Sequence, residues 1–260
     1  MKFSDLRTRH AMSPIERKGQ DRLLVTPRFI GVADGATPLD PSWPANVGDF
    51  AADALHELAT ASANEARDIR AVWRQAITTT AAKFSVKEPE LSCGVAMARP
   101  VRDSIEIATL GDCGVIVRCT DNSLVSLRDT RLSVLDEEAA SAIGPEMQRR
   151  LAYNRASMNT PAGYWVFAAH PGAADHICTK QIPMSEVVDL LLFSDGFYRL
   201  RDPYGIISGD GALVTMVRKL GPAQAIQQLR DYEYANNNID KIGDPLAPDD
   251  ATLVLAMRPE

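Results

Sequence analysis

Two short apolar runs near the start of the chain, RLLV at 22–25 and RFIGVAD at 28–34, are separated only by Thr-Pro. Runs of this length and composition predict two strands that pair through a tight turn. The stretch from 46 to 84 instead carries apolar residues at helical spacing. It predicts one or two long helices, with a break near Ser62 to Asn64.

From residue 91 the pattern returns to short β-branched or alternating runs, separated by Arg-Pro, Gly-Asp and Asp-Asn turn signals. They are LSCGVAMARP, DSIEIATLGD, CGVIVRCT and NSLVSLR. Consecutive strands with short turns predict an antiparallel meander. Helical sequence is expected from Asp129 to Arg155 with a break at Gly144-Pro145, followed by strands at 163–170 and 186–196.

The last part of the chain predicts two amphipathic helices, GDGALVTMVRKLG and PAQAIQQLRDYEYA, and a closing strand, ATLVLAMR. Antiparallel strands with segregated helices indicate the α+β class, with helices packed outside one or two sheets. No repeat or linker divides the sequence. We therefore expect residues 1–260 to form a single domain with a variable insert at about 129–185.

The amino-acid composition indicates a folded globular protein and says little more about its function. Apolar residues make up 45% and charged residues 24% of the chain, which is typical of globular proteins. The net charge of -6 is spread without a basic block, so nucleic acid is not an expected partner. No window approaches the roughly 18 apolar residues of a membrane span, and we expect a cytoplasmic protein without a membrane partner. The four cysteines lack CxxC spacing and predict reduced, structural thiols.

Acidic residues stand where several apolar runs end or begin. The runs supply Asp34 with Gly35, Asp195 with Gly196, Asp249 with Asp250, and Asp112. Carboxylates at the ends of rigid strands can meet at one rim of a sheet, where they repel one another unless a cation compensates. Mg²⁺ and Mn²⁺ prefer such oxygen ligands. Each Asp-Gly is also an ordinary turn sequence, so a shared metal site and separate turns both remain open at this point.

Six segments, in order, resemble the motif set of the metal-dependent protein phosphatases, the type 2C Ser/Thr phosphatase family. They are GQDRLLV, FIGVADG, LSCGVAMA, IATLGDCGVIV, LLLFSDGFY and PDDATLVL. The resemblance extends from about residue 15 to 257 and implies a four-layer α-β-β-α sandwich of two antiparallel sheets. It further implies two Mg²⁺ or Mn²⁺ ions, three in many bacterial members, and a phosphoprotein substrate from a Ser/Thr kinase pathway.

The resemblance also assigns roles to individual residues. Asp34 matches the acid that bridges both metals, and Gly35 matches the glycine that lends its carbonyl to one of them. Asp195 and Asp249 match the two further metal-binding acids. Asp250 stands where the family usually has asparagine.

Other motifs match less closely. Asp112 lies in the family's Gly-Asp-Ser motif, here Gly-Asp-Cys, whose acid helps to hold the third metal. Asp21 matches an acid that acts on the metals through water, with Gln20 in place of the neighbouring glutamate. The position of the family's phosphate-binding arginine is Glu16, so Arg17 is the candidate after a one-residue shift. Arg28 or an arginine of the insert would be its substitute.

A metal-bound water would be the nucleophile in such a centre. Two cations about 3.5 to 4 Å apart share a water, lower its pKa and neutralise the phosphoryl oxygens, so no side-chain nucleophile is needed. This agrees with the four histidines, none of which has a triad-like context.

Two other functions stay open. The changed arginine and glutamate are compatible with a pseudophosphatase that serves as a binding or regulatory module. The insert RRLAYNRASMNTPAGYWVF occurs where the family has a variable flap beside the active site, and its three arginines suit a phosphatase of small phosphoesters.

Overall fold

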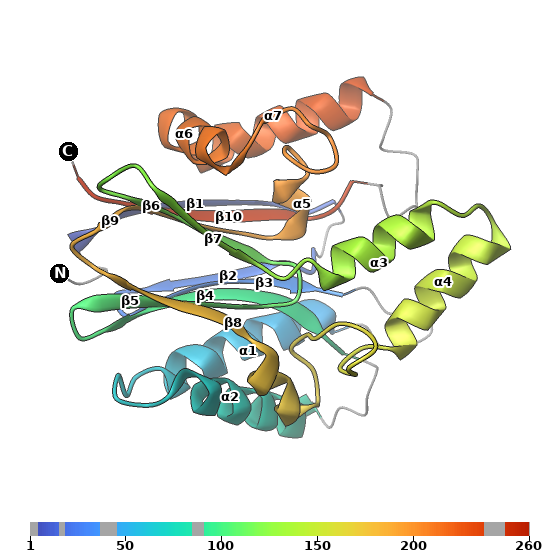
Figure 1. The fold of residues 1–260 in the computed structure, drawn as a ribbon, viewed down its shortest axis with the longest axis horizontal. Helices are drawn as coiled ribbons and strands as arrows, with labels where there is room; N and C mark the ends of the chain where they lie inside the picture. The colour runs from blue at the N-terminus through green and yellow to red at the C-terminus, as the bar shows by residue number, and fades with distance from the viewer. Residues whose placement is uncertain (1–4, 16–18, 37–45, 85–90, 237–247, 260) are drawn as a thin grey trace.

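The computed structural model describes residues 5–15, 19–36, 46–84, 91–236 and 248–259. Within these residues, two five-stranded antiparallel sheets lie face to face and helices cover their outer sides (Figure 1). The α+β prediction and the four-layer α-β-β-α arrangement are therefore confirmed. No helix in the described part of the chain combines the length and apolar character needed to cross a membrane.

Sheet A has the strand order β1-β10-β9-β6-β7. Its strands are β1 (Arg7–Ser13), β10 (Ala251–Met257), β9 (Val187–Phe193), β6 (Gly114–Cys119) and β7 (Leu124–Arg128). Helices α6 (Asp210–Leu220) and α7 (Pro222–Ala235) cover its outer face, as Figure 1 shows. Leu213 and Val217 of α6 pack there against Leu191 and Leu253 of the sheet. Both predicted helices and the closing strand are confirmed.

Sheet B has the order β2-β3-β4-β5-β8. Its strands are β2 (Arg22–Thr26), β3 (Phe29–Gly35), β4 (Cys93–Val101), β5 (Ser104–Leu110) and β8 (Cys178–Pro183). Its outer face is covered by α1 (Val47–Ala61), α2 (Ile69–Phe84) and the 3₁₀ helix η2 (Pro171–His176). The predicted β2–β3 hairpin and the predicted break between two long helices are both confirmed.

Strand β3 is apolar on both faces because it lies between two layers. Ile30 and Val32 belong to the core between the sheets, whereas Phe29 and Ala33 pack toward the helices outside sheet B. Alternate residues of a strand point to opposite faces, so burial of both faces requires a continuous apolar run. This explains why the run ends only where β3 leaves the core, at Asp34.

The predicted four-strand meander is wrong at its centre. Strands β4 and β5 pair in sheet B, but β6 and β7 pair in sheet A, so the chain changes sheets between Leu110 and Gly114. Gly111 has a φ of 78°, in the left-handed region that glycine tolerates best. A Cβ at this position would lie 2.8 Å from the Cα of Gly94. Two separate reasons therefore favour glycine at position 111: its positive φ and its close approach to β4.

The sequence analysis did not identify strands β1 and β8. Both are edge strands with several exposed residues, so they lack the apolar pattern of the central strands. Conversely, the strand predicted at 163–170 is wrong, since only Phe167 forms an isolated bridge with Cys93 there. Trp165 and Phe167 of this segment instead pack as part of a loop against the helices outside sheet B, whereas Tyr164 is buried in a separate cluster near α3.

The predicted insert at 129–185 contains several kinds of structure. Helices α3 (Arg131–Ala140) and α4 (Pro145–Ala156) form a hairpin that projects from one end of the sandwich (Figure 1). Gly144 precedes α4 with a φ of 60° and Pro145 is its first residue, as the predicted break requires. The end of the insert returns to sheet B as β8.

We expect Gly111→Ala to destabilise the protein more than Gly205→Ala. Both glycines have positive φ, and an alanine there costs about 1–2 kcal/mol of unfolding free energy. Nothing lies within 4 Å of a Cβ at Gly205, whereas Gly111 adds the clash with β4, worth roughly 1–3 kcal/mol more. Thermal and urea unfolding of both variants measure the difference. Equal losses would contradict the close approach.

Candidate metal centre

The predicted acidic residues meet at the end of the sandwich from which the α3–α4 hairpin projects. Each lies where a strand begins or ends: Asp34 at the end of β3, Asp112 in the β5–β6 turn, Asp195 at the start of α5 (Asp195–Tyr198) after β9, Asp249 before β10, and Asp21 before β2. Gly35 follows Asp34, is buried, and pairs with Cys93 of β4. The architecture thus brings together side chains that are up to 228 positions apart.

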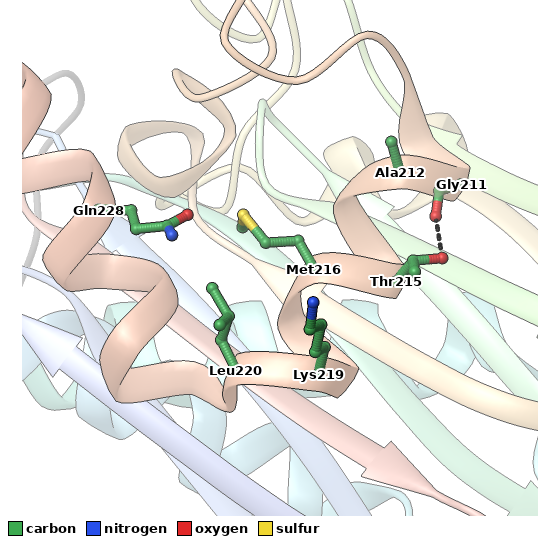
Figure 2. Close-up of a pocket in the computed structure, with 7 residues that line it drawn as sticks. All are labelled: Gly211, Ala212, Thr215, Met216, Lys219, Leu220 and Gln228. Atoms are coloured by element: carbon green, nitrogen blue, oxygen red, sulfur yellow. Dashed lines mark hydrogen bonds between the residues drawn. The ribbon is translucent and has the colours of Figure 1, made fainter.

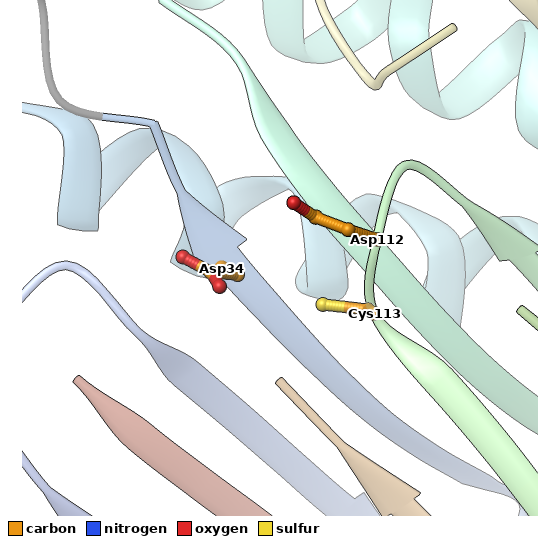
Figure 3. Close-up of side chains that lie close together, drawn as sticks. All are labelled: Asp34, Asp112 and Cys113. Atoms are coloured by element: carbon orange, nitrogen blue, oxygen red, sulfur yellow. The ribbon is translucent and has the colours of Figure 1, made fainter. Parts of the chain in front are cut away.

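Among the described residues, Asp34, Asp112 and Cys113 form a group that could hold a metal ion (Figure 3). One ligand atom from each of these residues lies within 4.8 Å of the other two. Both side chains of the β5–β6 turn point toward Asp34, as Figure 3 shows. Gly94 faces Asp34 across the β3–β4 pair, and a Cβ there would lie 2.6 Å from Asp112 Oδ1. A glycine at this position therefore leaves room for the Asp112 carboxylate.

Crowding of the carboxylates makes their ionisation costly. Burial, and then the charges of Asp21 and Asp195, raise the pKa of Asp34 well above its usual range. Burial raises the pKa of Asp112 to about 8, and Asp195 adds to this effect while Arg128 opposes it. Without a cation, this group of acids holds protons that isolated aspartates would release.

The outer members of the group show the same effect. Burial raises the pKa of Asp21 to about 7, although the hydroxyls of Thr252 and Ser194 oppose the shift. Desolvation and the charge of Asp195 raise the pKa of Asp249 to about 6. Each of these acids has its pKa raised in part by the charge of a neighbouring acid, so the acids form one electrostatically connected group.

Several carboxylate oxygens in this group lack a hydrogen-bond donor. Among the described residues, no hydrogen bond of normal geometry reaches either side-chain oxygen of Asp21, although the residue is only 2% exposed and the hydroxyls of Thr252 and Ser194 lie near it. Asp195 Oδ1 is also buried without a hydrogen-bond donor. Buried polar atoms are normally satisfied, so these orphaned oxygens require an explanation. The set consists of hard oxygen donors, and it fits divalent cations such as Mg²⁺ or Mn²⁺.

Asp250 has a structural role that differs from the metal-binding role predicted for its neighbour Asp249. Its carboxylate accepts hydrogen bonds from the backbone N–H groups of Ile15, Gln20 and Asp21, at 2.7, 2.5 and 3.3 Å. Two carboxylate oxygens can serve three donors, whereas an asparagine would offer only one acceptor oxygen. Asp250 therefore fastens the segment before β2, and with it Asp21, to the start of β10.

The arginines considered for phosphate binding lie in different parts of the chain. Arg17 lies outside the described residues. Arg28 lies at the opposite end of β3 from Asp34 and pairs with Glu65, so it is not a substitute. In the insert, Arg155 at the end of α4 donates from Nη1 to Ser92 Oγ at 3.1 Å, next to the start of β4. This arginine reaches the rim where the acids meet.

The sequence analysis missed four side chains around the centre: Cys113, Arg128, Asp136 and Arg199. Arg128 Nε donates to the backbone oxygen of Asp112 at 3.4 Å, and Arg199 lies 3.5 Å from Asp249. Burial, with a contribution from Asp195, raises the pKa of Asp136 on α3 to about 6. Of these four residues, only Cys113 could have been identified from the sequence, because it directly follows the Gly-Asp motif. The other three are brought in by tertiary structure.

A separate groove lies between α6 and α7 (Figure 2). It has a volume of about 490 Å³ and is lined mainly by the aliphatic and amide groups of Met216, Leu220 and Gln228, with Lys219 at its side. None of the predicted acids lines it. It therefore does not belong to the candidate centre.

A known protein family matches more than half of the chain. The family described as "Protein phosphatase 2C" matches residues 44–232. Among curated protein sequences, none matches this chain.

Solved structures of bacterial phosphatases share the fold. The Mycobacterium tuberculosis serine/threonine phosphatase PstP/Ppp matches with a TM-score of 0.59 and 15% identity, over 98% of this chain and 99% of that one. The PPM Ser-Thr phosphatase MsPP of Mycobacterium smegmatis, in complex with cacodylate, has a TM-score of 0.58 and 19% identity, over 97% and 98%. The catalytic domain of PstP in complex with two manganese ions gives 0.55 and 16%, over 97% of both chains.

We expect the metal-free protein to lose stability as pH rises. The pKa of Asp112 moves from 3.8 to about 8 on folding, so between these values the folded state binds the extra proton and unfolding becomes easier with increasing pH. Thermal unfolding in EDTA from about pH 5 to about pH 8 measures this trend. Excess Mn²⁺ should flatten or reverse it, because the cation binds only the folded, deprotonated acids.

Asp112→Asn is the informative variant for this trend, since it removes one of the groups with a raised pKa. Its metal-free protein should show a shallower loss of stability with pH, whereas Asp175→Asn, at an exposed position paired with Arg74, should keep the slope. A melting temperature in EDTA that rises over this range would show that the acids are not held protonated in the folded state.

Proposed function

Because the chain belongs to the protein phosphatase 2C family, we propose that it hydrolyses phosphoserine and phosphothreonine esters in proteins, with a metal centre as the catalyst. The observation that carries this proposal is the convergence of Asp34, Asp112, Asp195 and Asp249 at one rim, where burial and neighbouring charge raise the pKa values of Asp34 and Asp112. Asp195 Oδ1 is buried there without a hydrogen-bond donor. The family consists of Mg²⁺- or Mn²⁺-dependent Ser/Thr phosphatases, and one structural neighbour is in complex with two manganese ions.

We assign the cations to the acids that the motifs single out. Asp34, Asp195 and Asp249 would hold two ions together with the carbonyl of Gly35, and Asp112 would help to hold a third. Asp21 would act from its buried position behind them, through water. When bound, Mg²⁺ or Mn²⁺ ions supply a water of lowered pKa and neutralise charge that develops on the phosphoryl group. The reaction consumes water and releases the alcohol and inorganic phosphate.

The protein itself contributes position and charge balance. Asp34 and Asp112 are held by the ends of rigid strands, which limits the positional error of their oxygens. Asp250 fixes the segment that carries Asp21 through its hydrogen bonds to the backbone. Because phosphoryl transfer depends mainly on positioning and electrostatics, such a frame is sufficient and no side-chain nucleophile is required.

For the substrate phosphate we propose Arg155 as a binding group. It reaches the rim from α4, and its positive charge acts on Asp136 of α3 beside the acids. A guanidinium group offers the forked donors that suit phosphate. Arg17 remains a second candidate from the sequence. We further propose that the phosphoprotein belongs to a Ser/Thr kinase pathway and that the protein acts in the cytoplasm.

The pseudophosphatase alternative is less well supported. It explains the altered N-terminal motif, but it offers no reason for the retained cluster of acids with raised pKa values around Asp34. A phosphatase of small phosphoesters uses the same centre, and only substrate comparison separates it from the proposed function.

We expect release of phosphate from p-nitrophenyl phosphate and from a phosphothreonine peptide with Mn²⁺ or Mg²⁺, and none in EDTA. Asp34→Asn and Asp195→Asn should each lower kcat by roughly 100-fold or more, because the cations lose a ligand. Asp175→Asn is the matched control on the exposed surface. Circular dichroism and thermal unfolding show that the variants remain folded.

Two outcomes would redirect the assignment. A folded, metal-loaded protein that turns over neither substrate contradicts the enzyme proposal and leaves the binding module. Turnover of the small ester without turnover of phosphopeptides contradicts the protein substrate and supports the small-ester phosphatase.

We expect Arg155→Ala to raise the KM for the phosphopeptide by about 10- to 100-fold, the effect of losing one charge-assisted hydrogen bond. Arg155→Lys should recover part of the loss because it keeps the charge without the fork. Arg149→Ala is the control, since Arg149 is 76% exposed and pairs with Glu146 on the same helix. An unchanged KM in Arg155→Ala would contradict phosphate binding by Arg155. Arg17 would then be the remaining candidate, and Arg17→Ala can be tested in the same assay.

A further inference from the structure

Cys113 places a sulfur atom beside two carboxylates, at the edge of the core between the sheets. The residue is 0% exposed, and its Sγ lies within 4.8 Å of oxygen atoms of Asp34 and Asp112. In Figure 3 its side chain points toward the same space as that of Asp112. The motif that this turn resembles has serine here, so this chain has a sulfur atom where the motif has a hydroxyl oxygen.

The thiol lies between two acids, Asp34 and Asp112, and the apolar core between the sheets. Asp21 belongs to the same group of acids and is 2% exposed, and no hydrogen bond of normal geometry reaches either of its carboxylate oxygens. These unsatisfied oxygens point to a cation independently of the position of the sulfur.

A mixed set of sulfur and oxygen donors selects different cations from an all-oxygen set. Thiolate ligands favour soft or borderline ions such as Zn²⁺, Co²⁺ and Cd²⁺, whereas Mg²⁺ and Mn²⁺ gain little from sulfur. Three protein ligands with an open fourth position are typical of reactive zinc sites. Asp34, Asp112 and Cys113 offer this number of ligands within one small volume.

We propose that Cys113, with Asp34 and Asp112, forms a binding site for a thiophilic divalent cation. On binding, the cation displaces the thiol proton, so that one metal–sulfur bond forms, one S–H bond breaks and one proton passes to solvent. This site shares two acids with the proposed Mg²⁺ or Mn²⁺ centre but does not depend on phosphatase activity. In this proposal, the Cys113 side chain determines whether the site prefers thiophilic cations to Mg²⁺ and Mn²⁺.

The test is titration of the metal-free protein with Co²⁺ and Cd²⁺, followed by ultraviolet absorption. We expect a sulfur-to-metal charge-transfer band that saturates with one equivalent of cation. Cys113→Ser should lose the band, and its Cd²⁺ affinity should fall by about 10- to 100-fold. Its Mn²⁺ affinity, measured by the paramagnetic resonance signal of the free ion, should change by less than about threefold.

Cys119→Ser is the matched control, because Cys119 is also buried but lies at the far end of β6. It should retain the charge-transfer band. Bands that persist in Cys113→Ser, or that never appear in the parent protein while Cd²⁺ binds, would overturn the proposal. Cd²⁺ NMR of the parent protein distinguishes oxygen-only from sulfur-containing coordination without any variant, so misfolding of Cys113→Ser leaves the proposal testable.

Discussion

Repulsion between crowded carboxylates is the constraint around which this molecule is organised. Asp34 and Asp112 have raised pKa values because burial and neighbouring negative charge disfavour their ionised forms. Such a cluster is costly for a folded protein and persists only where something compensates for it. Protons compensate at low pH, and divalent cations do so at neutral pH. Stability and function are therefore two consequences of the same electrostatic arrangement.

The two-sheet sandwich supplies the stiffness that this arrangement requires. Asp34 ends a strand that is buried on both faces, while Asp112 lies in the turn where the chain changes from sheet B to sheet A. Gly94 leaves space for one carboxylate, and Asp250 anchors the segment that carries another. The acids thus come from both sheets but are held by neighbouring strands. Positional precision at the rim follows from packing in the core.

The fold was predictable where burial leaves a periodic pattern. The central strands, both helix pairs and the closing strand could be located because each buries a continuous face or stripe. Edge strands β1 and β8 could not, since their exposed residues break the alternation. The meander prediction failed at Gly111 because a short turn looks the same whether the next strand joins the same sheet or the opposite one. Sheet membership depends on contacts that are distant in sequence.

By itself, the sequence determined which acids stand at strand ends and in what order, because strand ends and Asp-Gly turns are local features. It could not determine that Cys113 approaches Asp34, that Arg155 reaches the start of β4, or that Asp250 binds backbone groups more than 200 positions away. These proximities arise only when the strands pair and the sheets pack together. The candidate ligands were therefore a matter of sequence, whereas the character of the site, including its sulfur atom, was decided by tertiary structure.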